Sequence, residues 1–150
     1  MKRFSHLNAR GEIRMVDVSA KPAVRREAVA RGSILLQPGT VGAIEKDEVA
    51  KGNVFACARV AGVLAAKKTG ELIPLCHPLN MTHCSVEFEI PPARDRVVIT
   101  ATASITAATG VEMEALTAVS VAALTIYDMC KALDKTMRIT DIVLVSKLKK

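Results

Sequence analysis

The sequence contains few aromatic side chains: among its 150 residues are three phenylalanines, one tyrosine and no tryptophan. Proteins that bind single-stranded nucleic acid stack its bases on aromatic rings, so this shortage argues against nucleic acid as a partner. Runs of lysine and arginine with interleaved aromatics are also lacking. Because hydrophobic residues still make up 50% of the chain, its core must consist mostly of alanine, valine, leucine, isoleucine and methionine.

The chain also lacks the sequence features of secreted and membrane proteins. Its four cysteines form no C-x-x-C pair, and no apolar segment of a secretion signal follows the polar residues 4–10. The most apolar stretch, Ala115 to Ile126, is too short to span a bilayer. We therefore expect a cytoplasmic protein with reduced thiols and no membrane partner.

Glycine-rich phosphate loops of the G-x-x-x-x-G-K-[ST] and G-x-G-x-x-G types are absent. Yet 21 lysines and arginines against 15 acidic residues give a net charge of +6, which favours an anionic partner. A small phosphate-bearing molecule, held by side chains and helix ends, fits better than nucleic acid. A solvated basic surface without a ligand is the alternative.

The length predicts one domain over residues 1–150. Within it, residues 1–20 are expected to form a flexible arm that becomes ordered only against another surface. The high apolar content predicts that part of the surface is buried between the subunits of a homo-oligomer.

Apolar periodicity and turn residues divide the chain into helices and strands. The expected strands are 33–36, 81–90, 97–105 and 139–145; the expected helices are a short one capped by Thr40 through residue 49, one from Asn53 to Gly70, and one over 111–133; segment 72–78 is irregular, and 147–150 is a basic tail. This order predicts an α+β fold, a ferredoxin-like sandwich whose antiparallel sheet has helices packed on one face.

Apolar residues surround nearly the whole circumference of the long helix, which predicts burial on most sides. Glu112 and Glu114 fall in its first turn, where the helix end stabilises anions, and alone they are ordinary. Near its end, Asp128 and Lys131 lie three residues apart and therefore share a face. Because apolar residues surround them, the pair must face water, a partner subunit or a cavity. The choice between a site and a surface ion pair stays open here.

A second candidate is the proline-flanked segment Pro74 to Pro78, in which His77 follows Cys76. A histidine on a rigid loop is a good polar anchor or general acid/base, because imidazole titrates near neutrality. Together with His83 and Cys84 it suggests zinc as an alternative. The spacing matches no common structural zinc pattern, and neighbouring residues of a strand point to opposite faces, so we expect no metal.

Four segments together resemble a known family. They are Met15 to Ser19, Lys51 to Phe55, Leu72 to Leu79, and Thr109 to Ala132. In this order, over almost the full chain, they resemble the cyclic pyranopterin monophosphate synthases, the protein C family of molybdenum-cofactor biosynthesis. The resemblance implies a ferredoxin-like lyase that converts 3′,8-cyclo-7,8-dihydroguanosine 5′-triphosphate to cyclic pyranopterin monophosphate and releases pyrophosphate. It also implies a homohexamer, a trimer of dimers with interfacial active sites, and no cofactor; Mg²⁺ accompanying the triphosphate is not indicated by the sequence.

The resemblance also assigns roles to individual residues. Asp128 matches the catalytic aspartate of the family, and Lys51 and Lys131 match lysines of acid/base and phosphate chemistry. The residues that match substrate-binding positions are Leu75, Cys76, His77, Met113 and Glu114, with Glu112 adjacent, and Arg26 and Lys67 for the triphosphate. One departure is the pair Ala107 and Ala108, where the family commonly has Gly-Lys; this removes one basic contact.

The length of the long helix has a consequence for the site. At about 1.5 Å per residue, its two polar ends lie roughly 20–25 Å apart, too far for one small molecule to touch both. We therefore expect each site to combine the start of one subunit's helix with the end of another's. Two other functions are alternatives: a noncatalytic module that binds nucleotides or RNA, and a zinc-dependent hydrolase that uses His77, His83 and Cys84.

Overall fold

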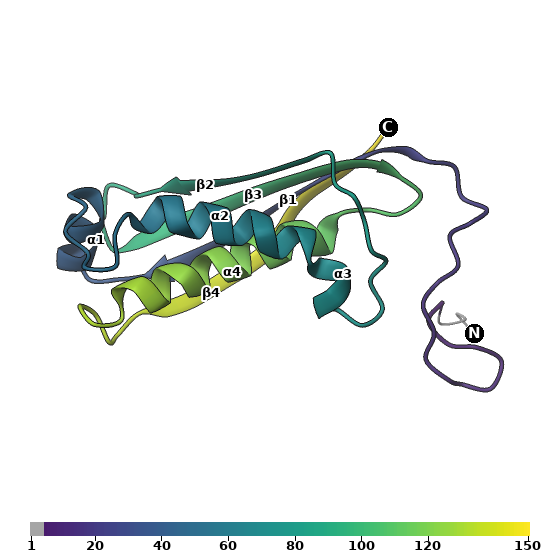
Figure 1. Ribbon diagram of the computed structural model, residues 1–150, viewed down its shortest axis with the longest axis horizontal. Helices are drawn as coiled ribbons and strands as arrows, with labels where there is room; N and C mark the ends of the chain where they lie inside the picture. Colours follow the sequence, from purple (N-terminus) through teal and green to yellow (C-terminus); the bar gives the residue numbers. More distant parts are fainter. Residues whose placement is uncertain (1–4) are drawn as a thin grey trace.

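Four strands form an antiparallel sheet in the order β2-β3-β1-β4, and helices cover one of its faces (Figure 1). This computed structural model describes residues 5–150. The elements are β1 (Val24–Leu35), α1 (Pro38–Glu45), α2 (Val54–Lys67), α3 (Thr69–Leu72), β2 (His83–Glu89), β3 (Arg96–Ala107), α4 (Glu112–Cys130) and β4 (Arg138–Lys149). The expected α+β class, with an antiparallel sheet and helices on one face, is confirmed.

The core lies between the sheet and the helices α2 and α4. On β3, alternate residues are fully buried against the helices, as the period-two pattern predicts. The two helices lie close together because small residues face each other where they meet. A Cβ atom added at Gly62 of α2 would lie only 2.9 Å from the carbonyl oxygen of Ala118 on α4. Helix α4 also lies close to the centre of the sheet, because a Cβ atom at Gly32 of β1 would lie only 2.8 Å from the Cγ1 atom of Val119.

Three strands are longer than the sequence predicted, and the difference is largest for β1 and β4. β1 begins at Val24 rather than at residue 33, because it pairs with β3 from Val24 opposite Ala107 to Leu35 opposite Arg96. Charged residues early in β1 interrupt the alternation of apolar and polar residues that predicts a strand, although Ala28 and Ala30 are buried. β4 continues to Lys149, so the expected basic tail is largely a strand paired with β1.

The helix boundaries also differ in detail. α1 begins at Pro38, whose fixed backbone angle suits a first helical position, and the side chain of Thr40 bonds to Asp134 instead of capping the helix. It ends before residue 49, at Glu45. The expected cap at Asn53 is confirmed, since its side chain accepts from the backbone N–H of Ala56 at 2.7 Å. Gly70 does not end α2, which stops earlier, but lies inside the short α3.

Helix α4 is buried on one face, so the prediction of burial on most sides is wrong for the single chain. Its buried residues recur at helical spacing, whereas Leu124 on the other side is 58% exposed. With 19 residues, the helix is long and apolar enough to cross a membrane by length and composition, contrary to expectation. Half of this apolar stretch is buried in the fold, as in the core helix of a soluble domain.

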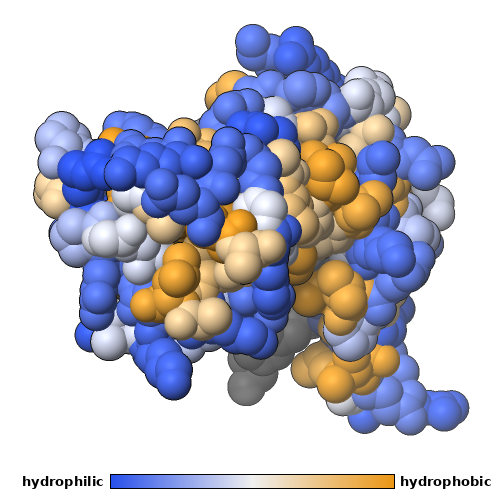
Figure 2. Space-filling view, turned by 60° about the vertical axis from the view of Figure 1, so that its left-hand side comes forward, coloured by the Kyte–Doolittle hydropathy of each residue, from blue (hydrophilic) through white to orange (hydrophobic). Residues whose placement is uncertain are grey.

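Apolar side chains also remain on the surface of the single chain. Figure 2 shows them as hydrophobic groups between hydrophilic ones on one side of the molecule. Those more than half exposed are Ile13, Val60, Leu64, Leu72, Leu124, Leu133, Val143 and Leu148. They lie on several elements, including α2, α4 and β4.

Candidate active site

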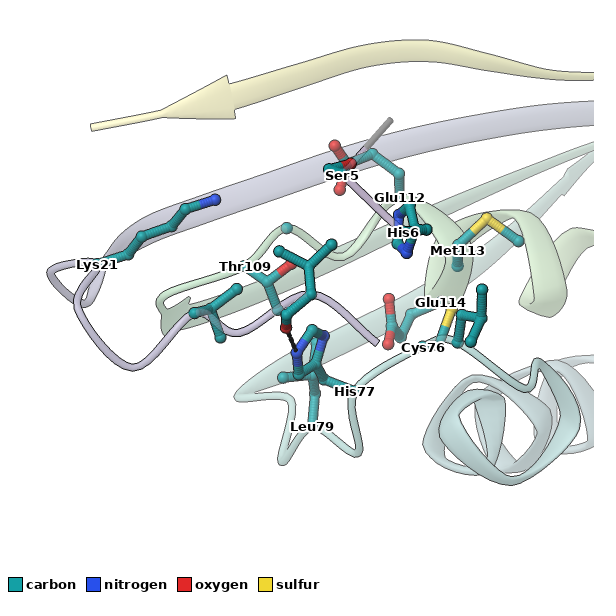
Figure 3. A pocket seen from close by; sticks show the side chains of 14 residues that line it. Ser5, His6, Lys21, Cys76, His77, Leu79, Thr109, Glu112, Met113 and Glu114 are labelled. Carbon is teal, nitrogen blue, oxygen red and sulfur yellow. Dashed lines mark hydrogen bonds between the residues drawn. The ribbon is translucent and has the colours of Figure 1, made fainter. Parts of the chain in front are cut away.

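A cavity of about 460 Å³ opens at the start of α4 (Figure 3). Its walls come from the N-terminal arm, from the loop before β2, and from the turn that leads into α4. Leu75, Cys76 and His77 line it, as do Glu112, Met113 and Glu114. The structure therefore brings together six of the residues that the sequence predicted for substrate binding, from two segments distant in the chain.

The loop that carries Cys76 and His77 is packed tightly against α3. A Cβ atom at Gly70 would lie 2.9 Å from the Cα atom of Pro78, so only glycine allows this approach. The His77 ring donates through Nε2 to the carbonyl oxygen of Val16 at 2.8 Å (Figure 3). This bond holds the arm against the loop. Residues 1–4 of the expected arm lie outside the described residues.

The first turn of α4 brings two carboxylates to the cavity. Glu114 is only 3% exposed, and burial raises its pKa above the ordinary value. Burial, with the nearby Glu114 charge, also raises the pKa of the Cys76 thiol. Glu112 is more open and pairs with Lys147 at 3.3 Å. The cavity thus holds one carboxyl group that is easily protonated and one that is held by a lysine.

A different arrangement occupies the other end of α4. One oxygen of Asp128 accepts from Lys51 Nζ at 2.7 Å, and its other oxygen accepts from Lys131 Nζ at 2.8 Å. Lys51 also donates to the backbone oxygen of Asp128 at 3.1 Å. The two hydrogen bonds, that from Lys131 first, lower the pKa of Asp128 to about 2. All three side chains are about half exposed.

This cluster is suited to phosphate chemistry. Its carboxylate is an anion at neutral pH, and the hydrogen bond with Asp128 raises the pKa of Lys131. A phosphate that displaces the carboxylate would meet two ammonium groups from different segments. The pairing of Asp128 and Lys131 on one helix face was predicted; the arrival of Lys51 beside them was not visible from spacing.

The predicted phosphate-binding residues lie apart from the cluster. Arg26 donates to the backbone oxygens of Ala107 and Ala108 at 3.0 and 3.1 Å, so these alanines fix its direction. Beside it, a hollow of about 190 Å³ is also lined by Gly110 and Lys147. Lys67 is exposed at the end of α2 and does not line the cavity.

The cavity contains further residues that sequence reasoning did not assign to it. Val16 and Val18 from the arm line it, and so do Lys21 and Thr109. The resemblance includes the segment from Met15 to Ser19 but assigns it no role in a site. A backbone carbonyl that binds a histidine leaves no side-chain signal in a sequence.

Within residues 5–150, no group of three or more histidine, cysteine or acidic residues is placed to hold a metal ion. His83 is exposed on β2, whereas Cys84 is half-buried on its other face. The zinc alternative therefore has no support from the geometry of these residues.

The two polar ends of α4 do not meet within one chain. Lys51, Asp128 and Lys131 are absent from the lining of the cavity among the described residues. The 19 residues of α4 span nearly 30 Å at the usual helical rise of about 1.5 Å each. A single chain therefore keeps the cavity and the charged cluster apart.

Comparisons with known proteins identify the family of the chain. The model of the MoaC family matches residues 15–149. A protein of Chloroflexus aggregans named cyclic pyranopterin monophosphate synthase is 58% identical over 145 residues, which cover 97% of this chain and 88% of that protein. One of the same name from Desulforapulum autotrophicum is 57% identical over 147 residues, covering 98% and 90%. Cyclic pyranopterin monophosphate synthase 3 of Mycobacterium bovis is 56% identical over 144 residues, covering 96% and 81%.

Proposed function

The chain belongs to the MoaC family and is an enzyme, and we propose that it is the lyase that converts 3′,8-cyclo-7,8-dihydroguanosine 5′-triphosphate to cyclic pyranopterin monophosphate in molybdenum cofactor biosynthesis. The observation that carries this proposal is the carboxylate of Asp128 between the ammonium groups of Lys51 and Lys131. Closing the cyclic phosphate requires a hydroxyl oxygen to attack the α-phosphorus while its bond to the bridging oxygen breaks. The hydroxyl proton must be removed, and pyrophosphate must leave with its charge offset.

The charged cluster supplies groups for each of these needs. Lysine ammonium groups offset the negative charge that develops on the leaving pyrophosphate. The carboxylate of Asp128 is unprotonated at neutral pH and takes up the hydroxyl proton, while its hydrogen bonds hold both lysines in place. We therefore assign catalysis to Lys51, Asp128 and Lys131.

The cavity at the start of α4 is the proposed binding site for the ring system of the substrate. Its volume of about 460 Å³ lies in the usual range for small-molecule sites. Buried Glu114 offers a carboxyl group to ring N–H donors, and Met113 offers apolar contact. Arg26 and Lys67 are proposed to bind the phosphates. No resident cofactor is proposed; Mg²⁺ would arrive with the triphosphate.

We propose that a complete site forms between two subunits. The cavity of one subunit and the charged cluster of another would then share one substrate, since α4 separates them within the chain. Exposed apolar side chains on several elements offer the surface that such contacts need (Figure 2). The proposed assembly is a cytoplasmic homohexamer, a trimer of dimers.

The test is turnover of the cyclic GTP derivative by the purified protein. We expect formation of cyclic pyranopterin monophosphate and an equal amount of pyrophosphate. Lys51→Ala should abolish both, whereas Lys46→Ala, at the exposed end of α1, should leave both unchanged. Unaltered turnover in Lys51→Ala would refute the site, and binding of substrate without any product would refute the activity.

A further inference from the structure

Asp134 is a buried charge that the proposed chemistry does not use. It lies in the turn between α4 and β4 and is only 2% exposed. Burial of a carboxylate costs free energy unless hydrogen bonds replace its water. This residue therefore needs partners, and the identity of those partners indicates its role.

Four hydrogen bonds hold the carboxylate, two from the start of α1 and two from Thr136 in its own turn. One oxygen accepts from the backbone N–H of Gln37 at 2.8 Å and from the hydroxyl of Thr40 at 3.3 Å. The other accepts from the N–H and hydroxyl of Thr136, at 2.8 and 2.7 Å. Although burial acts to raise the pKa of Asp134, these bonds hold it below the ordinary value. The group is an anion at neutral pH.

The bonds to Gln37 and Thr40 lie at the start of α1. This helix has no side-chain cap of its own and no acidic residue in its first turn. Asp134 supplies the missing anion from a segment distant in the sequence, where it meets the N–H of Gln37 and the positive helix end. The carboxylate thus fastens the start of α1 to the turn that follows α4.

The two segments joined in this way are close to the charged cluster along the chain: Asp134 follows Lys131 by three residues, and Lys51 follows the end of α1 by six. On one side, the N–H of Asp134 donates to the carbonyl oxygen of Cys130, so the carboxylate is fixed to the end of α4. On the other side, α1 leads through buried Val49 to Lys51. The ion pair between Lys51 and Asp128 is exposed, and exposed pairs contribute little to holding segments together.

We propose that Asp134 is a positioning residue, whose buried carboxylate holds the segment of Lys51 against the end of α4 and so keeps Lys51 opposite Asp128. The inference rests on the proposed function in one respect: it takes these two residues as part of the catalytic centre. Asp134 itself does not touch the substrate. It acts indirectly, because it keeps Lys51 within hydrogen-bond distance of Asp128, although these two residues lie 77 positions apart in the sequence.

The test is Asp134→Asn. The amide keeps the shape of the side chain but replaces one acceptor oxygen with a donor, so an N–H of Gln37 or Thr136 loses its partner. We expect kcat to fall about 10- to 100-fold while KM changes less than about threefold, because chemistry is disturbed more than binding. Val86→Ala, a core change in β2, is the control with a similar loss of thermal stability and an unchanged kcat.

A second measurement does not depend on activity. The pKa of Asp128, followed by carboxyl-carbon NMR, should rise from about 2 toward its ordinary value in Asp134→Asn, because Lys51 moves away. If this variant does not fold, Thr40→Val removes one hydrogen bond and should give the same changes at smaller size. An unchanged Asp128 titration, or a kcat equal to that of the stability-matched control, would overturn the proposal. Activity in Lys51→Ala would instead refute the proposed catalytic centre. The Asp128 titration in Asp134→Asn would still decide whether Asp134 positions Lys51.

Discussion

The two ends of α4 carry acidic groups in opposite surroundings. At its start, Glu114 is buried in a cavity, and its pKa is raised by that burial and by the nearby charge of Glu112. At its end, Asp128 is exposed on the surface, and its pKa is lowered to about 2 because two lysines bind it. The comparison shows that one end places a buried carboxyl group in a cavity, while the other exposes a carboxylate between two lysines.

The largest effect is expected at the exposed end. Asp128→Ala removes the group that bonds to both Lys51 and Lys131, and kcat should fall by about 10³-fold or more. The melting temperature should change by less than about 2 °C, because exposed ion pairs add little to stability. Steady-state kinetics and calorimetry measure the two quantities. A large loss of stability together with a small loss of rate would show that the cluster is structural.

The next prediction joins the two ends. Met113→Arg fills the cavity and Asp128→Ala removes the carboxylate, so each variant alone is inactive. Both variants are co-expressed, and two affinity tags select the mixed oligomers. A site between two subunits takes the start of α4 from one and the end of α4 from the other, and each of these is intact in half of the subunits. Turnover should therefore return at roughly a quarter of the sites. Mixed oligomers that remain inactive would show that each site lies within one subunit.

A smaller effect is expected for the arm that closes the cavity. His77→Ala removes the hydrogen bond to the Val16 carbonyl, so KM should rise about tenfold, the factor that about 1.4 kcal/mol produces. The amides of residues 16–19 should also exchange faster with deuterium, because the arm has lost its attachment. His83→Ala, on the exposed face of β2, is the control and should change neither quantity. An unchanged KM in the cavity variant would mean that the arm plays no part in binding.

The smallest effect concerns stability alone. Because the folded-state pKa of Glu114 is raised, the folded protein binds this proton more tightly, and stability falls as pH rises from the ordinary value through the raised one. Glu114→Gln removes that loss. The melting temperature of this variant should be roughly 2–4 °C higher than that of the parent protein at pH 8. The two melting temperatures should be equal at pH 4, where residue 114 is neutral in both folded proteins. A variant that is less stable at pH 8 would mean that the charge of Glu114 is satisfied in the fold.

Sequence patterns predicted the elements whose burial is regular. The helix cap at Asn53 and the alternation of β3 are local features, so a short window of residues contains them. The beginning of β1 was missed because Arg25 and Arg26 interrupt its alternation, and pairing with β3 stabilises it from outside the window. Tertiary partners decide such boundaries.

The site was predictable only in part, for the same reason. Asp128 and Lys131 share a helix face, and that follows from their spacing. Lys51 lies far from them in sequence, and only resemblance to a family placed it in the same centre. Asp134 was not singled out at all, because an aspartate after a helix looks like an ordinary turn residue until its partners at Gln37 and Thr40 are known.

The order of strands in the sheet bears on how the chain folds as it is made. β1 lies between β3 and β4, which both follow it in the sequence (Figure 1). On a ribosome, β1 has no neighbour until β3 emerges, and one of its edges stays open until residues 138–149 have been synthesised. Open edges pair with strands of other chains, and long-range pairing is slow. A partly synthesised chain therefore exposes an edge of β1 that is prone to aggregation, although β1 lies inside the finished sheet. We expect the nascent chain to depend on chaperones until β4 pairs with β1.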